Sequence, residues 1–230
     1  MLSILDLIDA GTADLELAAL LMAGIARGAS FMVGARPGGA GKTTVMCALL
    51  NLIPPDCEIM AATAQAVQAA ARESARRCYV CHEIGSGPWF AYLWGADLRA
   101  YCALAGKGHI LATNLHADDL DEARMQVCEE NGVPENHFNA FHLAVFLRVK
   151  GGGGRGSRWI DKVYASNGAA PHKLVFDSKK GIATAALPDT EHFDPAWVGR
   201  CRSFLEEHLE SRIRTIEDVR RNVLGFFQNE

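Results

Sequence analysis

The stretch Arg36-Pro37-Gly38-Gly39-Ala40-Gly41-Lys42-Thr43-Thr44 decides the fold of this chain. It is close to the pattern G-x-x-x-x-G-K-[ST], in which a glycine-rich turn between a strand and a helix curls its backbone N–H groups around a phosphate. An apolar strand is expected just before it, at 30–34 (SFMVG), and a helix just after it, at 43–52. The residues that we expect to hold the phosphates are Gly38, Gly39, Ala40, Gly41, Lys42, Thr43 and Thr44.

The residue types in the loop suit this chemistry. The N-terminus of the following helix adds partial positive charge, Lys42 is expected to reach the β- and γ-phosphates, and the Thr43 hydroxyl is expected to bind Mg²⁺. Arg36 replaces the first glycine of the pattern. It implies a different turn before the loop, or a side chain that points to solvent or to a neighbouring subunit. The competing interpretation is a glycine-rich turn with a lysine by chance.

Strand and helix patterns alternate along the rest of the first 131 residues. A helix is expected at 13–27, strands at 57–62, 78–84 and 109–114, and helices at 64–77, 88–105 and 118–131. This alternation predicts an α/β fold with a mainly parallel central sheet flanked by helices. Beyond Pro134 we expect strand pairs at 144–149 with 159–165 and at 172–176 with 182–186, and then two amphipathic helices. We divide the chain into a core at 1–168 and, at 169–230, a C-terminal hairpin and helices packed on it.

An acidic residue ends the expected strand 78–84. Nucleotide hydrolysis needs a carboxylate on a neighbouring strand, to hold the water shell of the metal or to polarise the attacking water. Ligands of open α/β sheets bind at the carboxyl ends of the strands, so Glu83 is our candidate. The alternative is a solvated glutamate at a strand end.

The same strand contains Cys78-x-x-Cys81-His82, the spacing of a c-type haem attachment site. We reject haem because no export signal is visible, and zinc because no second ligand pair is evident. Two cysteines three positions apart in a strand also point to opposite faces. The seven cysteines are odd in number and scattered, which indicates reduced, buried thiols.

Composition limits the partners. The net charge of -4 gives no reason to expect sequence-independent binding to nucleic acid. The N-terminal segment is apolar but carries Asp6, Asp9, Asp14 and Glu16, so it is unlike a signal peptide. No uncharged apolar run reaches the roughly 18 residues of a membrane span. We expect a cytoplasmic protein.

The segment 108–117 (GHILATNLHA) resembles the histidine box of the type II/type IV secretion ATPases, the motors of pilus assembly, pilus retraction and DNA transfer. Residues 4–11 (ILDLIDAG) and 48–56 (ALLNLIPPD) look like the Tad-pilus and VirB-type branch, and 82–85 (HEIG) looks like its G-E-I-R segment. The resemblance covers about residues 1–166.

The resemblance implies a RecA-like P-loop ATPase core that uses ATP and Mg²⁺. It also implies a homo-oligomer, normally a hexamer with nucleotide at subunit interfaces, that is held near the inner membrane by a secretion or pilus assembly. Carried over by position, Lys42 and Thr43 bind phosphate and metal, Glu83 is the catalytic carboxylate, and His116 senses or positions the γ-phosphate. His116 has an alternative role as a strand-end histidine satisfied by hydrogen bonds, and His109 is expected to be structural.

Three departures from the family predict slow or partner-dependent hydrolysis. The strand 59–64 (IMAATA) lacks the acidic pair, and Gln126 stands where an arginine is usual. Only about 35 residues precede the loop, so we expect the N-terminal domain that supplies arginines to be absent. An arginine contributed by a neighbouring subunit is worth orders of magnitude in rate.

Two other features have open roles. The loop 151–158 contains Arg155 and Arg158, and we favour a flexible hairpin tip over a phosphate or subunit contact. The aromatic residues of the expected helix 88–105 indicate core packing or a subunit contact rather than base stacking: Trp89, Phe90, Tyr92 and Trp94. The rival functions are a nucleotide-binding module with little or no turnover and, ranked last, a small-molecule kinase.

Overall fold

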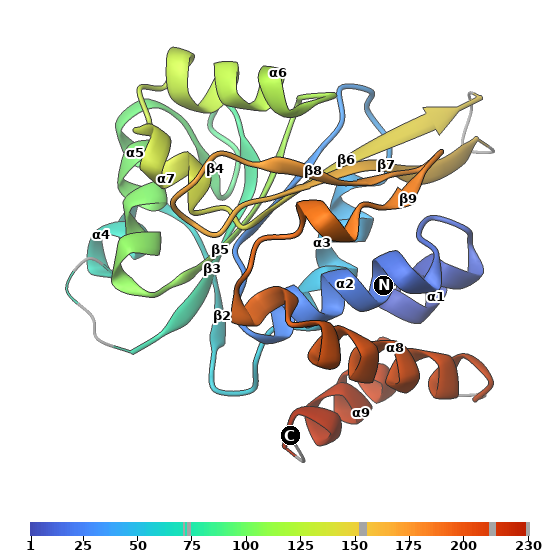
Figure 1. Ribbon diagram of the computed structural model, residues 1–230. Helices are drawn as coiled ribbons and strands as arrows, with labels where there is room; N and C mark the ends of the chain where they lie inside the picture. Colours follow the sequence, from blue (N-terminus) through green and yellow to red (C-terminus); the bar gives the residue numbers. More distant parts are fainter. Residues whose placement is uncertain (71, 73–74, 152–155, 212–214, 229–230) are drawn as a thin grey trace.

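The computed structural model describes residues 1–70, 72, 75–151, 156–211 and 215–228. Within them one sheet runs in the order β2-β3-β5-β1-β6-β7-β8-β9, and β4 also pairs with β3 (Figure 1). The strands are β1 Phe31–Gly34, β2 Glu58–Ala61, β3 Arg77–Ile84, β4 Tyr92–Leu93, β5 Ile110–Leu115, β6 Leu143–Lys150, β7 Ser157–Ala165, β8 Lys173–Asp177 and β9 Gly181–Ile182. The pairs from β2 to β6 are parallel and those from β6 to β9 are antiparallel.

Helices cover both faces of the sheet. They are α1 Ile4–Asp9, α2 Leu15–Ala26, α3 Lys42–Leu50, α4 Ala64–Ala70, α5 Gly95–Ala103, α6 Leu120–Arg124, α7 Glu135–Asn139, α8 Pro195–Leu209 and α9 Ile216–Gln228, and a π-helical turn, η2 Met125–Glu130, continues α6. The predicted α/β fold with a mainly parallel sheet between helices is therefore confirmed.

Two buried clusters fill the space between these layers. One packs α1, α2, α3, α8 and α9 against one face of the sheet, and the other packs α4 to α7 against the opposite face. Cys78 belongs to the first cluster and Cys81 to the second, so the two thiols do point to opposite faces. All seven cysteines are free.

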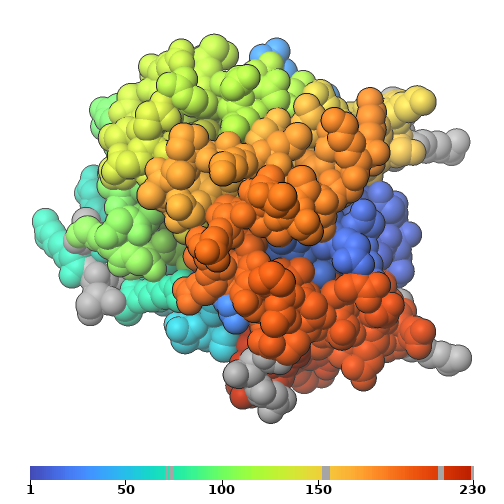
Figure 2. All heavy atoms as spheres, viewed as in Figure 1, coloured from blue at the N-terminus to red at the C-terminus, as the bar shows by residue number. Residues whose placement is uncertain are grey.

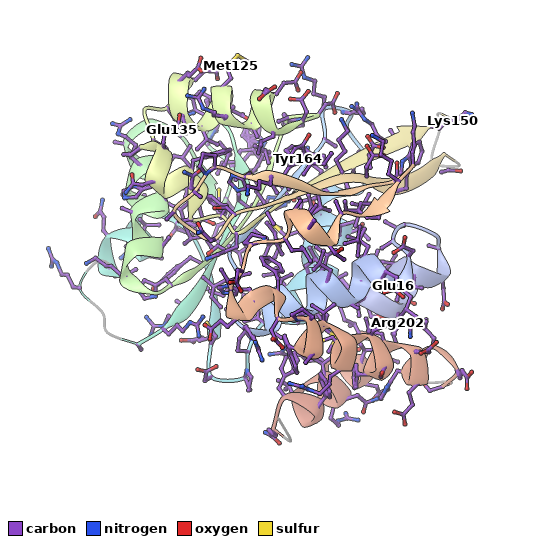
Figure 3. The ribbon with its side chains drawn as sticks, viewed as in Figure 1. Glu16, Met125, Glu135, Lys150, Tyr164 and Arg202 are labelled. Carbon is purple, nitrogen blue, oxygen red and sulfur yellow. The ribbon has the colours of Figure 1, made fainter. Side chains whose placement is uncertain are left out.

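The C-terminal segment packs along α2. Trp197 of α8 is buried, donates its indole N–H to the carbonyl of Ala23 at 3.0 Å and stacks on Phe226 of α9. Figure 2 shows this segment, orange to red, spread over one face of the molecule, and Figure 3 shows Glu16 beside its ion-pair partner Arg202. Strand β8 also pairs with β7, so the sheet runs across the predicted boundary at residue 168.

The long helix predicted over 88–105 is wrong in its first half. Residues 85–91 form a loop, β4 follows, and the helix begins only at Gly95. Trp89 and Phe90 are 59% and 72% exposed, so core packing is excluded for both. The predicted strand 182–186 is also shortened, because a 3₁₀ turn occupies Thr184–Ala186. Among the described helices, none combines the length and the apolar character that crossing a bilayer requires.

Candidate functional site

The glycine-rich loop leaves the carboxyl end of β1 at the middle of the sheet. Gly34, the last residue of β1, has no room for a side chain, because a Cβ there would lie 2.7 Å from the carbonyl oxygen of Ala117 and from the ring of Phe146. Gly39 and Gly41 have φ angles of +75° and +97°, which a residue with a side chain rarely adopts. These glycines therefore allow the tight turn from β1 into α3.

The loop leaves its backbone donors available. In the part of the chain that the structure describes, the N–H groups of Gly39, Gly41, Lys42 and Thr43 donate to no protein acceptor. A Cβ at Gly38 or Gly39 would meet nothing within 4 Å, so no side chain of the described residues crowds the loop there. Free amides at the N-terminus of α3 form a cradle that fits an anionic phosphate group.

Lys42 reaches from the start of α3 back across this cradle. Its ammonium group donates to the carbonyl of Ala35 at 3.1 Å and lies 3.6 Å from Oε2 of Glu83. Burial lowers the pKa of Lys42, and the carboxylate of Glu83 partly opposes this shift. The lysine therefore places a positive charge at one end of the loop, next to the candidate carboxylate.

Glu83 lies at the end of β3, but β3 is not next to β1. The expectation of a neighbouring strand is wrong, because β5 lies between the two and pairs in parallel with both. Glu83 is only 7% exposed, and its Oε1 has no hydrogen-bond partner among the described residues. Burial raises the pKa of Glu83, and Lys42 and His116 pull it back down. A carboxyl group of this kind is suited to accept a proton from water.

His116 follows β5 and completes a group of three side chains. Its Nδ1 lies 3.3 Å from Nζ of Lys42 and 3.2 Å from the carbonyl oxygen of Arg36, and its Nε2 lies 3.9 Å from Oε2 of Glu83. The tautomer decides whether Nδ1 donates to the carbonyl or accepts from the lysine. The structure thus brings together three of the predicted site residues, Lys42, Glu83 and His116, with the imidazole about half exposed.

Arg36 points away from this group. Its guanidinium binds the carboxylate of Glu122 in α6 through two contacts, of 2.9 Å and 2.7 Å, and its backbone N–H donates to Asp118 at 2.8 Å. None of these contacts was expected from the sequence. The arginine at the first position of the pattern therefore ties the loop to α6 within the same chain.

The hairpin of β6 and β7 reaches the opposite end of the loop. Arg158 of β7 donates through Nε to the carbonyl of Gly39 at 2.9 Å. A pocket of about 600 Å³ lies here and is lined by the loop, Glu83, His116, Arg158 and residues of the N-terminal segment, among them Leu2, Leu7, Ala10 and Thr12. The glycine-rich sequence of this hairpin favours a flexible tip over a phosphate or subunit contact, and Arg158 is not among the predicted site residues. Arg155 lies outside the described residues.

Gln126 lies beside the end of β3. It occupies η2 and donates from Nε2 to the carbonyl of Ile84 at 3.2 Å. Asn114 of β5 similarly donates to the carbonyl of His82 at 3.0 Å. Both amides therefore fix the backbone on either side of Glu83 rather than offering a charge to a ligand.

Few protein groups are available for a metal ion. No group of three or more His, Cys, Asp or Glu side chains suited to a metal occurs in the described ranges. Mg²⁺ usually takes only one or two protein ligands and fills the rest of its shell with water and phosphate oxygens. The exposed hydroxyl of Thr43 and the unpartnered Oε1 of Glu83 fit that limited requirement.

Comparisons with known proteins give matches in structure but not in sequence. No family model and no curated protein matches the chain. It is similar to the VirB11 ATPase from the Brucella suis type IV secretion system, at 17% identity over 69% of this chain and 60% of that one, with a TM-score of 0.47. It is also similar to the Legionella pneumophila ATPase DotB, at 13% identity over 90% of this chain and 58% of that one, with a TM-score of 0.47. The chain thus spans about three-fifths of the length of each.

Proposed function

We propose that this chain binds ATP with Mg²⁺ and hydrolyses it to ADP and phosphate, as the nucleotide-binding core of a secretion- or pilus-type motor. The convergence of Lys42, Glu83 and His116 on a loop with unpartnered amides carries the proposal. A triphosphate matches the cradle in charge and in hydrogen-bond type.

Each residue has a distinct role in this mechanism. The loop amides and Lys42 hold the β- and γ-phosphates, and bound Mg²⁺ would neutralise charge on the transferring group. Glu83 orients a water molecule and accepts its proton as the water oxygen bonds to the γ-phosphorus and the bond to the β-γ bridging oxygen breaks. His116, within reach of Lys42 and Glu83, positions the γ-phosphate.

The proposal extends to assembly and place in the cell. We propose that the chain forms a homo-oligomer, which by the family resemblance is a hexamer. It would act in the cytoplasm at a membrane-bound assembly. We propose no nucleic-acid ligand, since the net charge is -4. Size measurement with and without ATP tests the oligomer separately from the chemistry.

Single-turnover hydrolysis of ATP tests the chemistry. Wild-type protein, in excess over radiolabelled ATP, is compared with Glu83→Gln and Lys42→Ala. We expect Glu83→Gln to bind ATP normally and to lose about 100-fold or more in rate, because it keeps the shape and removes the base. Lys42→Ala is expected to lose nucleotide binding itself. Bound ATP with no turnover above Glu83→Gln would instead favour the module that binds nucleotide without hydrolysing it.

A further inference from the structure

Arg158 is a guanidinium with an unusual set of partners. Its Nε donates to the carbonyl of Gly39 at 2.9 Å, and its Nη1 donates to the carbonyl of Gly156 at 3.1 Å. A guanidinium has five N–H donors, so three are left after these two bonds. In the described parts of the chain no carboxylate pairs with it. Its positive charge is therefore uncompensated.

Other arginines close to the loop differ in this respect. Arg36 forms a two-contact pair with Glu122, and Arg148, on the adjacent strand β6, lies 3.4 Å from Asp118 and 3.4 Å from Asp161. Both charges are neutralised by the protein. Arg158 is instead held by carbonyl oxygens, which orient a guanidinium without neutralising it. An arginine held in this way is prepared to bind an anion.

The position of Arg158 along the loop identifies which part of a nucleotide it would meet. Lys42, Glu83 and His116 meet at the Ala35 end of the loop, where the γ-phosphate belongs. The side chain of Arg158 lies against the other end, with its Cδ 3.4 Å from the position of a Cβ on Gly41.

Part of the wall of this pocket is apolar. The N-terminal segment contributes Leu2, Leu7 and Ala10 to it, and the carbonyl of Thr12 accepts a 2.8 Å hydrogen bond from Ile160, two residues after Arg158 in β7. An apolar wall suits a nucleobase, whereas the opposite end with Glu83 and His116 suits the reacting phosphate. Arg158 contacts the loop at Gly39 and Gly41, away from the Ala35 end.

We infer that Arg158 binds the α- and β-phosphates of the nucleotide from within the same chain. This rests on the proposed function, since it presumes a nucleotide in the pocket. The α- and β-phosphates are present in ATP and ADP alike, and Arg158 lies away from the side chains that surround the γ-phosphate, so we expect this contact to act on nucleotide binding rather than on the chemical step. Arg158 is thus a substrate-binding residue and not a source of transition-state charge.

Equilibrium binding of ADP and of a non-hydrolysable ATP analogue tests this inference. Arg158→Ala and Arg158→Gln are compared with wild type, with Arg148→Ala as the control, which removes an arginine from the same hairpin outside the pocket. We expect the Arg158 variants to lose about 10- to 100-fold in affinity for both nucleotides, with kcat at saturating ATP unchanged. Arg148→Ala is expected to bind as wild type does. Two substitutions are used so that a folding defect in one leaves the other informative, and the melting temperature of each reports its folding.

Three results separate the possible failures. If the Arg158 variants bind both nucleotides like wild type, the inference is wrong while the proposed function stands. If kcat falls and ADP affinity is kept, the inference is also wrong, because the arginine then acts on the transferring group. If wild type binds neither nucleotide and Lys42→Ala behaves identically, the proposed function itself fails.

Discussion

The two ends of the pocket hold their charges in opposite ways. At the Ala35 end, Lys42 and Glu83 are buried, lie 3.6 Å apart and offset each other's charge. At the Gly41 end, Arg158 is half-buried, and its hydrogen bonds to the described residues all go to backbone carbonyls. The side chains of the first end come from α3, from β3 and from the residue after β5. We call these elements, with β1 and β2, the parallel half. Arg158 comes from β7, and we call β6 to β9 the hairpin half.

This difference shows how each end is suited to its task. A buried lysine and glutamate are costly to desolvate, and each one compensates the cost of the other. Their pKa values respond to anything that disturbs the balance, which is appropriate for a group that exchanges protons. An arginine keeps its proton at any accessible pH, so an unpaired one can only bind. Under the proposed function, the parallel half therefore supplies the chemistry together with the phosphate binding by Lys42 and the loop, whereas Arg158 of the hairpin half adds affinity alone.

The largest loss of stability is expected for a substitution at Gly34, where the parallel half and the hairpin half meet. Gly34 lies opposite Leu115 of β5 and Phe146 of β6, and a Cβ would lie 2.7 Å from the Ala117 carbonyl and the Phe146 ring. We expect Gly34→Ala to lower the free energy of unfolding by about 2–3 kcal/mol, because backbone and ring must both move. Urea unfolding of wild type and Gly34→Ala without nucleotide measures this difference in the free energy of unfolding.

Gly38→Ala is the matched control for this prediction. It lies four residues further along the same segment, its φ is outside the left-handed region, and an added Cβ would meet nothing within 4 Å. Its unfolding free energy is expected to change by less than about 0.5 kcal/mol. If Gly34→Ala lowers the free energy of unfolding as little as Gly38→Ala does, the packing around Gly34 is not tight and the prediction is wrong.

Most of the parallel half could be predicted from the sequence. The position of Lys42 follows from a local pattern, and Glu83 follows from the rule that ligands gather at the carboxyl ends of parallel strands. The strand order could not be predicted, because the pattern does not reveal that β5 inserts between β1 and β3. The prediction of a helix over 88–105 is wrong because the aromatic residues before Gly95 resemble a helix face in the sequence, whereas they lie in a loop and in β4.

The hairpin half was much harder to predict. A run of glycines at 151–154 is typical of a mobile tip, and nothing in it indicates that Arg158 returns to a loop 119 residues earlier in the chain. Nor does the sequence indicate the pairing of Arg36 with Glu122. Both contacts depend on tertiary packing, which local patterns do not encode. A useful signal would have been Arg158 itself. It lies at the start of β7, and β7 pairs with β6, the strand beside β1.

Acidification tests how the hairpin half is anchored to the parallel half. His142, just before β6, accepts the backbone N–H of Ser30 on Nδ1 at 3.2 Å, so it must be neutral there. Burial, together with His192 and His172, lowers the pKa of His142 to about 4. Between about pH 6.5 and pH 4 the unfolded chain binds a proton that the folded one refuses, so stability falls as pH falls. We expect a loss of about 1–2 kcal/mol between pH 7 and pH 5, measured by urea unfolding.

The variant His142→Asn provides the control, since its amide does not titrate. It is expected to be less stable at pH 7 but to lose less stability on acidification than wild type does. The pKa values of His172 and His192 are also lowered by burial, so part of the pH dependence remains in the variant. An unchanged slope would mean that His142 is not the group responsible.

The smallest effect is expected for the pair of Arg36 and Glu122, and it tests the contrast between the two arginines most directly. The Arg36 side chain is 58% exposed, and exposed ion pairs contribute little because water and salt screen them. A double-mutant cycle of Arg36→Ala and Glu122→Ala should give a coupling of about 0.5 kcal/mol in urea unfolding. Glu122→Ala alone is expected to cost more, since Glu122 also accepts the backbone N–H of Asp118 at 2.8 Å.

Nucleotide affinity then decides whether the contrast is real. Because the guanidinium of Arg36 is occupied by Glu122, Arg36→Ala should change the Kd for ADP by less than about twofold. The variant Glu122→Ala frees Arg36 and so leaves a second uncompensated guanidinium near the loop. A loss of ADP affinity in Arg36→Ala as large as that in Arg158→Ala would mean that pairing with a carboxylate does not keep an arginine from the phosphates. Charge compensation by a carboxylate would then not distinguish the two arginines.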